Sequence, residues 1–105
     1  MNIYKKGGLD TKAMHSLRHI AQLQTEIGKT NEAENNYTKI LKFYDANKDT
    51  PIGELVNIQR GYALLLEKTK NPAEAKTYWI KARDLYKKLE ISEGVNECNI
   101  HIIKL

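Results

Sequence analysis

Residues recur at a fixed distance of 42 positions along this chain of 105 residues. Ala33 and Ala75 form one such pair, and the large aromatic residues Tyr37 and Trp79 form another. The same offset relates further pairs: Arg18 and Arg60, Ala21 and Ala63, Leu23 and Leu65, Glu32 and Glu74, Lys39 and Lys81, Tyr44 and Tyr86, and Asn57 and Asn99. An internal repeat of this length predicts a stack of equivalent units, each of which buries its apolar face against a neighbour.

Apolar residues within each unit recur three or four positions apart, which is the spacing of one face of a helix. Four such faces cover residues 13–27, 33–44, 52–66 and 75–89, and a shorter fifth face runs from Val95 through Cys98 and Ile102 to Leu105. No segment shows the alternation of a strand. The sequence therefore predicts an all-α fold of about five helices.

Turn residues stand between these faces. We expect Gly28 to end the first helix. Capping residues are expected to begin the following helices: Asn31 with Glu34 for the second, Thr50-Pro51 for the third, Asn71-Pro72 for the fourth and Ser92 for the fifth. Connections this short predict that consecutive helices are antiparallel neighbours, so the chain forms helical hairpins.

Small and bulky residues alternate in both units in one order. The residues concerned are Ala21, Gly28, Glu32, Ala33 and Tyr37 in the first unit, and Ala63, Glu74, Ala75, Trp79 and Ala82 in the second. At these positions the chain resembles the tetratricopeptide repeat (TPR) family. Its period exceeds the family's usual length of about 34 residues, and it is similar to the extended subclass of about 40–42 residues found in kinesin light chains and many bacterial scaffolds. Ile40 and Lys70 depart from the pattern, which has a small residue and a glycine there.

The resemblance implies that the hairpins stack as a right-handed superhelix. We expect residues 1–9 to be a flexible lead-in and residues 10–105 to form one TPR-like domain. Within it, the first repeat covers about 10–48, the second about 50–90, and a capping or partial third-repeat helix about 92–105.

Composition argues against several classes of function. The net charge of +4 comes from charges of both signs mixed along the chain, whereas a nucleic-acid-binding protein clusters its basic residues. Apolar runs are far shorter than a membrane span needs, and the N-terminal residues do not resemble a signal peptide. From the charge pattern and the short apolar runs we expect neither a membrane nor a nucleic-acid partner. A single cysteine suits a reducing compartment, so we expect a cytoplasmic protein.

Catalytic and metal-binding patterns are incomplete. His15 and His19 have the spacing of two helical zinc ligands, but Ser16 stands where a general base would be and the sequence offers no third ligand. This favours a solvated pair of histidines facing a groove. Cys98 falls on the apolar face of the last helix and is expected to be buried and inert. The sequence therefore predicts no catalytic residue, no metal, no cofactor and no enzymatic activity.

The resemblance implies that the first helix of each hairpin lines a concave surface where extended or helical peptides bind. Nine residues are expected there: His15, Arg18, His19, Gln22, Glu26, Asn57, Arg60, Leu64 and Glu67. Arg18 and Arg60 would select acidic groups of the ligand, because a guanidinium holds a carboxylate in a bidentate pair. Gln22 and Asn57 would bind peptide backbone, and Leu64 an apolar side chain.

Alternatives stay open at this point, both for the arginines and for the domain. Instead of holding a ligand, the arginines are solvated, or they pair inside the domain with Gln22, Glu26 or Glu67. Instead of binding a peptide, the domain is a structural element of a larger helical-repeat protein, which associates with another copy or domain through its C-terminal helix. A third function for the domain is that of an enzyme accessory or a sensor of phosphorylated ligands.

Overall fold

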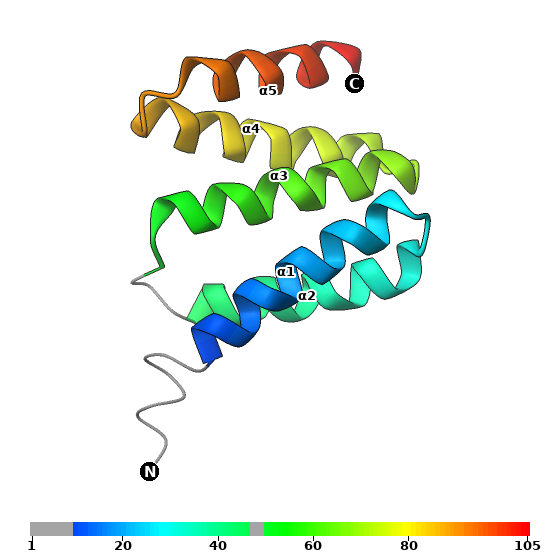
Figure 1. Ribbon diagram of the computed structural model, residues 1–105. Helices are drawn as coiled ribbons and strands as arrows, with labels where there is room; N and C mark the ends of the chain where they lie inside the picture. Colours follow the sequence, from blue (N-terminus) through cyan, green and yellow to red (C-terminus); the bar gives the residue numbers. More distant parts are fainter. Residues whose placement is uncertain (1–9, 47–49) are drawn as a thin grey trace.

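The computed structural model describes residues 10–46 and 50–105, and this part of the chain is an all-α fold without strands (Figure 1). Its helices are α1 (Asp10–Glu26), α2 (Thr30–Ala46), α3 (Ile52–Lys68), α4 (Pro72–Lys88) and α5 (Ser92–Lys104). None of these helices is long and apolar enough to cross a membrane. The flexible lead-in expected at residues 1–9 lies outside the described residues.

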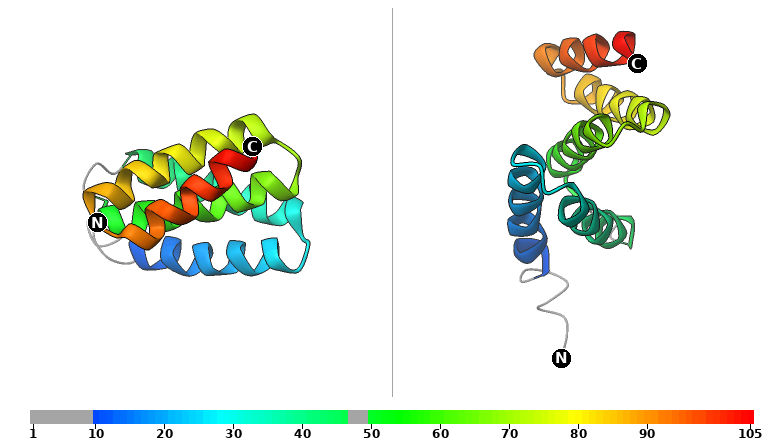
Figure 2. Two further views of the ribbon diagram at one scale, coloured as in Figure 1. Left: turned by 90° about the horizontal axis from the view of Figure 1, so that it is seen from above. Right: turned by 90° about the vertical axis from the view of Figure 1, so that its right-hand side faces the viewer.

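The helices are arranged as antiparallel hairpins stacked in chain order. Each helix packs against the next one in sequence, and α1 also contacts α3. Figure 2 shows the stack rising from α1 and α2 through α3 and α4 to α5. This helical-repeat arrangement confirms the fold class that the sequence predicts.

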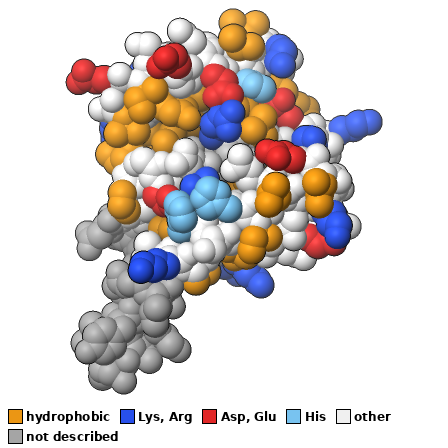
Figure 3. All heavy atoms as spheres, in the orientation of Figure 1, with side chains coloured by type: hydrophobic (Ala, Val, Ile, Leu, Met, Phe, Trp, Pro, Cys, Tyr) orange, Lys and Arg blue, Asp and Glu red, His pale blue; other side chains and the backbone are white. Residues whose placement is uncertain are grey.

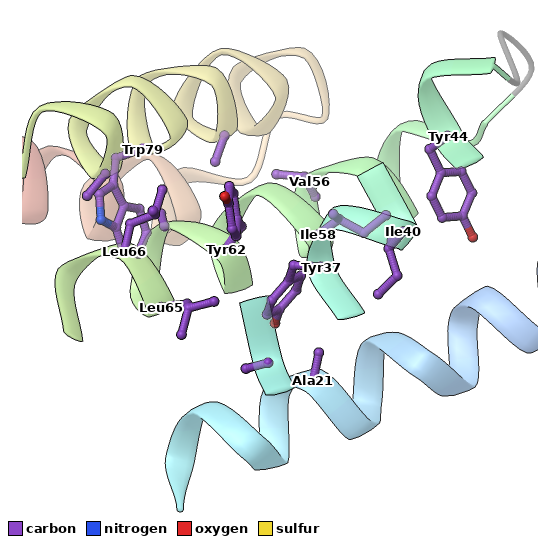
Figure 4. Packing of buried hydrophobic residues seen from close by; sticks show 14 of the residues in the cluster. Ala21, Tyr37, Ile40, Tyr44, Val56, Ile58, Tyr62, Leu65, Leu66 and Trp79 are labelled. Atoms are coloured by element: carbon purple, nitrogen blue, oxygen red, sulfur yellow. The ribbon is translucent and has the colours of Figure 1, made fainter. Parts of the chain in front are cut away.

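The core repeats along the stack in the way the 42-residue offset requires. The four small residues at the expected helix contacts are all completely buried: Ala21, Ala33, Ala63 and Ala75. Tyr37 and Trp79 are also buried beside them, and in Figure 4 Tyr37 lies near Tyr62 of the next helix. A small residue lets two helices approach closely and an aromatic side chain fills the space next to the contact.

Three helices end in the same turn. Gly28 has a φ of +88° and ends α1 as predicted, and Lys70 and Glu90 adopt the same left-handed conformation with φ values of 62° and 58°. In each turn an amide reaches back five residues, for example from Asn71 to the Leu66 carbonyl at 2.9 Å. This is the Schellman motif, which satisfies carbonyls at a helix end.

Most of the predicted helix starts are wrong by about one residue. Asn71 does precede α4, although its side chain makes no capping hydrogen bond, but Asn31 lies inside α2, and Pro51 and Ile91 occupy the cap positions expected for Thr50 and Ser92. The reason at α2 and α5 is the preceding turn. The residue after the left-handed position serves both helices. The Ile91 amide donates to the Tyr86 carbonyl at the end of α4, and the Ile91 carbonyl accepts from the Val95 amide at the start of α5.

Candidate functional site

A hollow of about 310 Å³ lies between the two equivalent first helices, α1 and α3. It is lined by Arg18, Gln22, Thr25, Glu26, Tyr37, Asn57, Arg60, Gly61, Leu64 and Lys68. All of these residues except Tyr37 belong to α1 or α3. The two helices therefore share one wall.

Six of the nine residues that the sequence assigns to the groove meet in this hollow. They are Arg18, Gln22, Glu26, Asn57, Arg60 and Leu64. Sequence reasoning assigned Tyr37 to the core alone, whereas its hydroxyl end reaches the hollow beside Gly61, a glycine whose missing side chain makes room for it. The signal for this contact was Gly61 itself, a residue otherwise unfavourable inside a helix.

The other three residues do not line this hollow. His15 lines a second hollow of about 390 Å³ together with Glu54, and His19 contacts His15. Glu67 instead joins α3 to the following helices. It accepts a hydrogen bond from the Trp79 indole and lies 2.6 Å from Nδ1 of His101, whose ring stacks on Trp79.

Arg18 forms an ion pair with the next first helix. Its side chain is only 9% exposed, and its Nε donates to Oε2 of Glu54 at 3.3 Å. The other carboxylate oxygen of Glu54, Oε1, lies 3.2 Å from Nδ1 of His15. The positive charge of Arg18 is therefore balanced inside the domain, because a guanidinium this buried needs a partner.

Arg60 repeats this arrangement one unit later. Its Nε and one terminal nitrogen donate to the two carboxylate oxygens of Glu97, at 2.8 and 2.7 Å. The hydrogen bonds raise the pKa of Arg60 and lower the pKa of Glu97 from its usual 4.5. The internal partner of each arginine is thus a carboxylate two helices further along the chain, Glu54 of α3 for Arg18 and Glu97 of α5 for Arg60. The alternative that paired the arginines with Gln22, Glu26 or Glu67 named the wrong residues.

Chemical reactivity is low at the remaining candidate residue. Cys98 is completely buried on α5, and this burial, with a contribution from Glu97, raises the pKa of its thiol to about 11. A buried thiol that keeps its proton at neutral pH is a poor nucleophile. In residues 10–46 and 50–105 no group of three or more His, Cys, Asp or Glu side chains is placed to hold a metal ion.

Comparison with protein-family models, with curated proteins and with solved structures finds no match for this chain. Two properties of the molecule itself bear on its function. One is the equivalence of its two repeats, and the other is the geometry of the hollow that they share.

Proposed function

We propose that this protein is a TPR-like, non-catalytic interaction module that binds a peptide segment of a partner protein in the hollow between α1 and α3. The observation that carries the proposal is the shared wall, in which equivalent helices of two repeats surround one hollow of about 310 Å³. A preformed concave surface of this kind binds an extended or helical segment without a large rearrangement. The buried free thiol of Cys98 suits the reducing cytoplasm, which we propose as its compartment.

The lining residues suggest how a peptide would be held. Gln22 and Asn57 carry amides that donate to and accept from peptide backbone. Leu64 supplies apolar contact, and Arg60 retains N–H donors that Glu97 does not use. Because both arginines are already paired, we expect selectivity for acidic ligands to be weaker than two unpaired guanidiniums would provide.

The test is selection of peptides from a displayed random library, followed by measurement of their affinity for matched variants. Asn57→Arg places a long charged side chain at the hollow, and Asn35→Arg makes the same change at an exposed position of α2. We expect Asn57→Arg to weaken binding at least about tenfold, the effect of losing one well-made contact of about 1.4 kcal/mol, and Asn35→Arg to leave it unchanged. Equal affinity of both variants, or a library that yields no binder, would overturn the proposal.

Charge reversal of Arg18 and Arg60 is a poorer test. It removes the partners of Glu54 and Glu97 and leaves those carboxylates beside a second negative charge. Lost binding would then reflect lost packing as much as a lost ligand contact.

A second candidate function, self-association of the stack, is favoured by an apolar face on α1. Ile20 and Leu23 of α1 are 47% and 59% exposed, and Ile27 in the turn after α1 is 65% exposed. The equivalents of the first two in α3, Tyr62 and Leu65, are buried, and Tyr62 contacts Tyr37 of α2. The exposed face of α1 thus corresponds to a surface that a preceding helix covers in the second repeat.

The C-terminal helix α5 also carries exposed apolar side chains. Cys98 is buried, whereas Ile100 and Ile103 are 59% and 83% exposed, so α5 is a second candidate surface for self-association. Sedimentation equilibrium separates the candidates: self-association abolished by Leu23→Gln and retained by Ile103→Gln would locate an interface on α1. A monomer at all concentrations would exclude assembly and leave peptide binding.

A further inference from the structure

His15 and His19 lie one turn apart on α1 with their imidazoles turned toward each other. Their Nε2 atoms are 3.2 Å apart, and the ring planes meet at 76°. Both residues are exposed, and the side chain of His15 is 51% accessible to solvent. Histidine side chains are visible on this face of the molecule in Figure 3, beside a carboxylate.

This separation is the one that two nitrogens have when they share a metal ion. With metal–nitrogen distances of about 2.0–2.1 Å and a near-tetrahedral angle, two ligating nitrogens lie about 3.1–3.4 Å apart. We propose that His15 and His19 form a two-histidine surface site for a divalent transition metal ion of the Zn²⁺, Ni²⁺ and Cu²⁺ class. Imidazole nitrogen is a preferred ligand of each of these ions.

Glu54 of α3 supplies the orienting contact for this site. Its Oε1 lies 3.2 Å from Nδ1 of His15, so the ring donates its Nδ1–H to the carboxylate and presents an unprotonated Nε2 to the ion. Arg18 in turn holds the other oxygen of Glu54. A carboxylate behind a ligating histidine fixes its tautomer and raises its basicity, as in many zinc sites.

The proton balance of binding is simple. With its Nδ1–H donated to Glu54, His15 accepts at Nε2, so the Nε2–H of His19 is assigned as the donor of the contact between the two rings. When the ion binds, that proton moves to Nδ1 of His19 by exchange with solvent, and both Nε2 lone pairs face the metal. This rearrangement releases no proton, because one N–H proton moves between the two nitrogens of the His19 ring.

The remaining coordination positions are open to solvent. The hollow of about 390 Å³ beside His15 is lined by Thr11, Lys12, Ser16, Pro51 and Glu54. None of these residues completes a cluster of three metal ligands in the part of the chain that the structure describes. Water, or a side chain of a bound molecule, would occupy those positions, and the ammonium of Lys12 would weaken the site relative to a closed one.

The experiment is calorimetric titration of the full chain with Zn²⁺ alone, at neutral pH in a buffer that does not chelate metals. We expect one ion per chain and a loss of affinity of tenfold or more in both His15→Gln and His19→Gln. Glu54→Gln should weaken binding about tenfold, the usual effect of removing an orienting carboxylate. His101→Gln changes a histidine at another place in the stack and should leave the affinity unchanged.

Circular dichroism of each variant shows whether the helices remain intact, and because His15 and His19 are exposed their substitution should not unfold the chain. The electron paramagnetic resonance spectrum of bound Cu²⁺ gives a second readout, hyperfine coupling to two imidazole nitrogens. Wild-type protein that takes up no Zn²⁺, or uptake that survives His19→Gln, would overturn the proposal. Neither result bears on peptide binding between α1 and α3, which the Asn57→Arg variant tests separately.

Discussion

Lys70 and Glu90 hold backbone conformations that cost L-residues energy. Their φ values of 62° and 58° lie in the left-handed region, where the Cβ atom crowds the following carbonyl. Gly28 occupies the corresponding place after α1 and lacks this cost. Glycine at either of these two positions would therefore remove this conformational cost.

We expect Lys70→Gly and Glu90→Gly each to raise the free energy of unfolding by about 0.5–1 kcal/mol, a gain reduced by the greater backbone entropy of glycine in the unfolded chain. Gly28→Ala is the control in the opposite direction, because it introduces the same strain, and it should lower the free energy of unfolding by about 1 kcal/mol. Urea unfolding followed by circular dichroism measures all three. Destabilisation by both glycine substitutions would show that the native lysine and glutamate side chains contribute more than the strain costs.

Gly61 is required by a neighbouring side chain and not by its own backbone angles. A Cβ atom at this position would overlap the Tyr37 hydroxyl and lie 3.0 Å from the ring carbon that carries it. Tyr37 is only 1% exposed, so its ring has little room to shift.

Gly61→Ala should therefore destabilise the protein by about 1–3 kcal/mol, although alanine is the better helix former. In a Tyr37→Phe background the hydroxyl is absent, and we expect the same substitution to cost at least about 1 kcal/mol less. A double-mutant cycle of unfolding free energies measures the difference. An identical cost in both backgrounds would show that the overlap is relieved elsewhere.

At the scale of the helices, ion pairs between successive first helices connect the repeats. Arg18 of α1 pairs with Glu54 of α3, and Arg60 of α3 pairs with Glu97 of α5. The second pair has the better geometry because it is bidentate, but both of its side chains are about one-third exposed. Solvent screening at this exposure limits its contribution.

We expect a coupling energy of about 0.5–1 kcal/mol in a double-mutant cycle of Arg60→Ala and Glu97→Ala at neutral pH. Because the pKa of Glu97 is lower in the folded state than its usual 4.5, this contribution is present above pH 4.5 and is lost as the pH falls through the folded-state pKa. The cycle repeated in strong acid should therefore show no coupling. Coupling that persists there would assign the energy to packing of the two side chains.

The whole molecule should lose stability in alkali through its buried acids. Burial raises the pKa of the Cys98 thiol from 9.0 to about 11 and that of the Tyr37 hydroxyl from 10.0 to about 12. Each group stays protonated longer in the folded state, so the unfolded state loses its proton first as the pH rises.

Unfolding free energy is thus expected to decline from about pH 9 to pH 12, with the thiol contributing in the lower part of this interval. Chemical denaturation at a series of pH values measures the slope. In Cys98→Ala the decline between pH 9 and 11 should be smaller, although alanine lowers stability at neutral pH by leaving a cavity. An unchanged slope in that variant would assign the alkaline loss to other groups.

The helices and the repeated core could be predicted because both leave a periodic trace in the sequence. The apolar spacing located all five helices, and the 42-residue offset identified Ala21, Ala63, Ala33 and Ala75 as contact points, each of which is completely buried. Helix starts were predicted less well, because the backbone of the preceding turn determines where the next helix begins. Glu90 shows this clearly, since it adopts a left-handed conformation without being a glycine, and the helix after it is capped by Ile91, one residue before the expected Ser92.

The sequence by itself therefore determined which helices form and the order in which they stack. Helical periodicity and side-chain size relate residues that are close in the chain or one repeat apart, so both can be read along the sequence. Tertiary structure alone decided the partners of the charged residues. Arg18 and Glu54 are 36 positions apart, Arg60 and Glu97 are 37 apart, and His15 and Glu54 are 39 apart. Such pairs form or fail according to the rotation of one helix relative to the next, and that rotation follows from the packing of the whole interface.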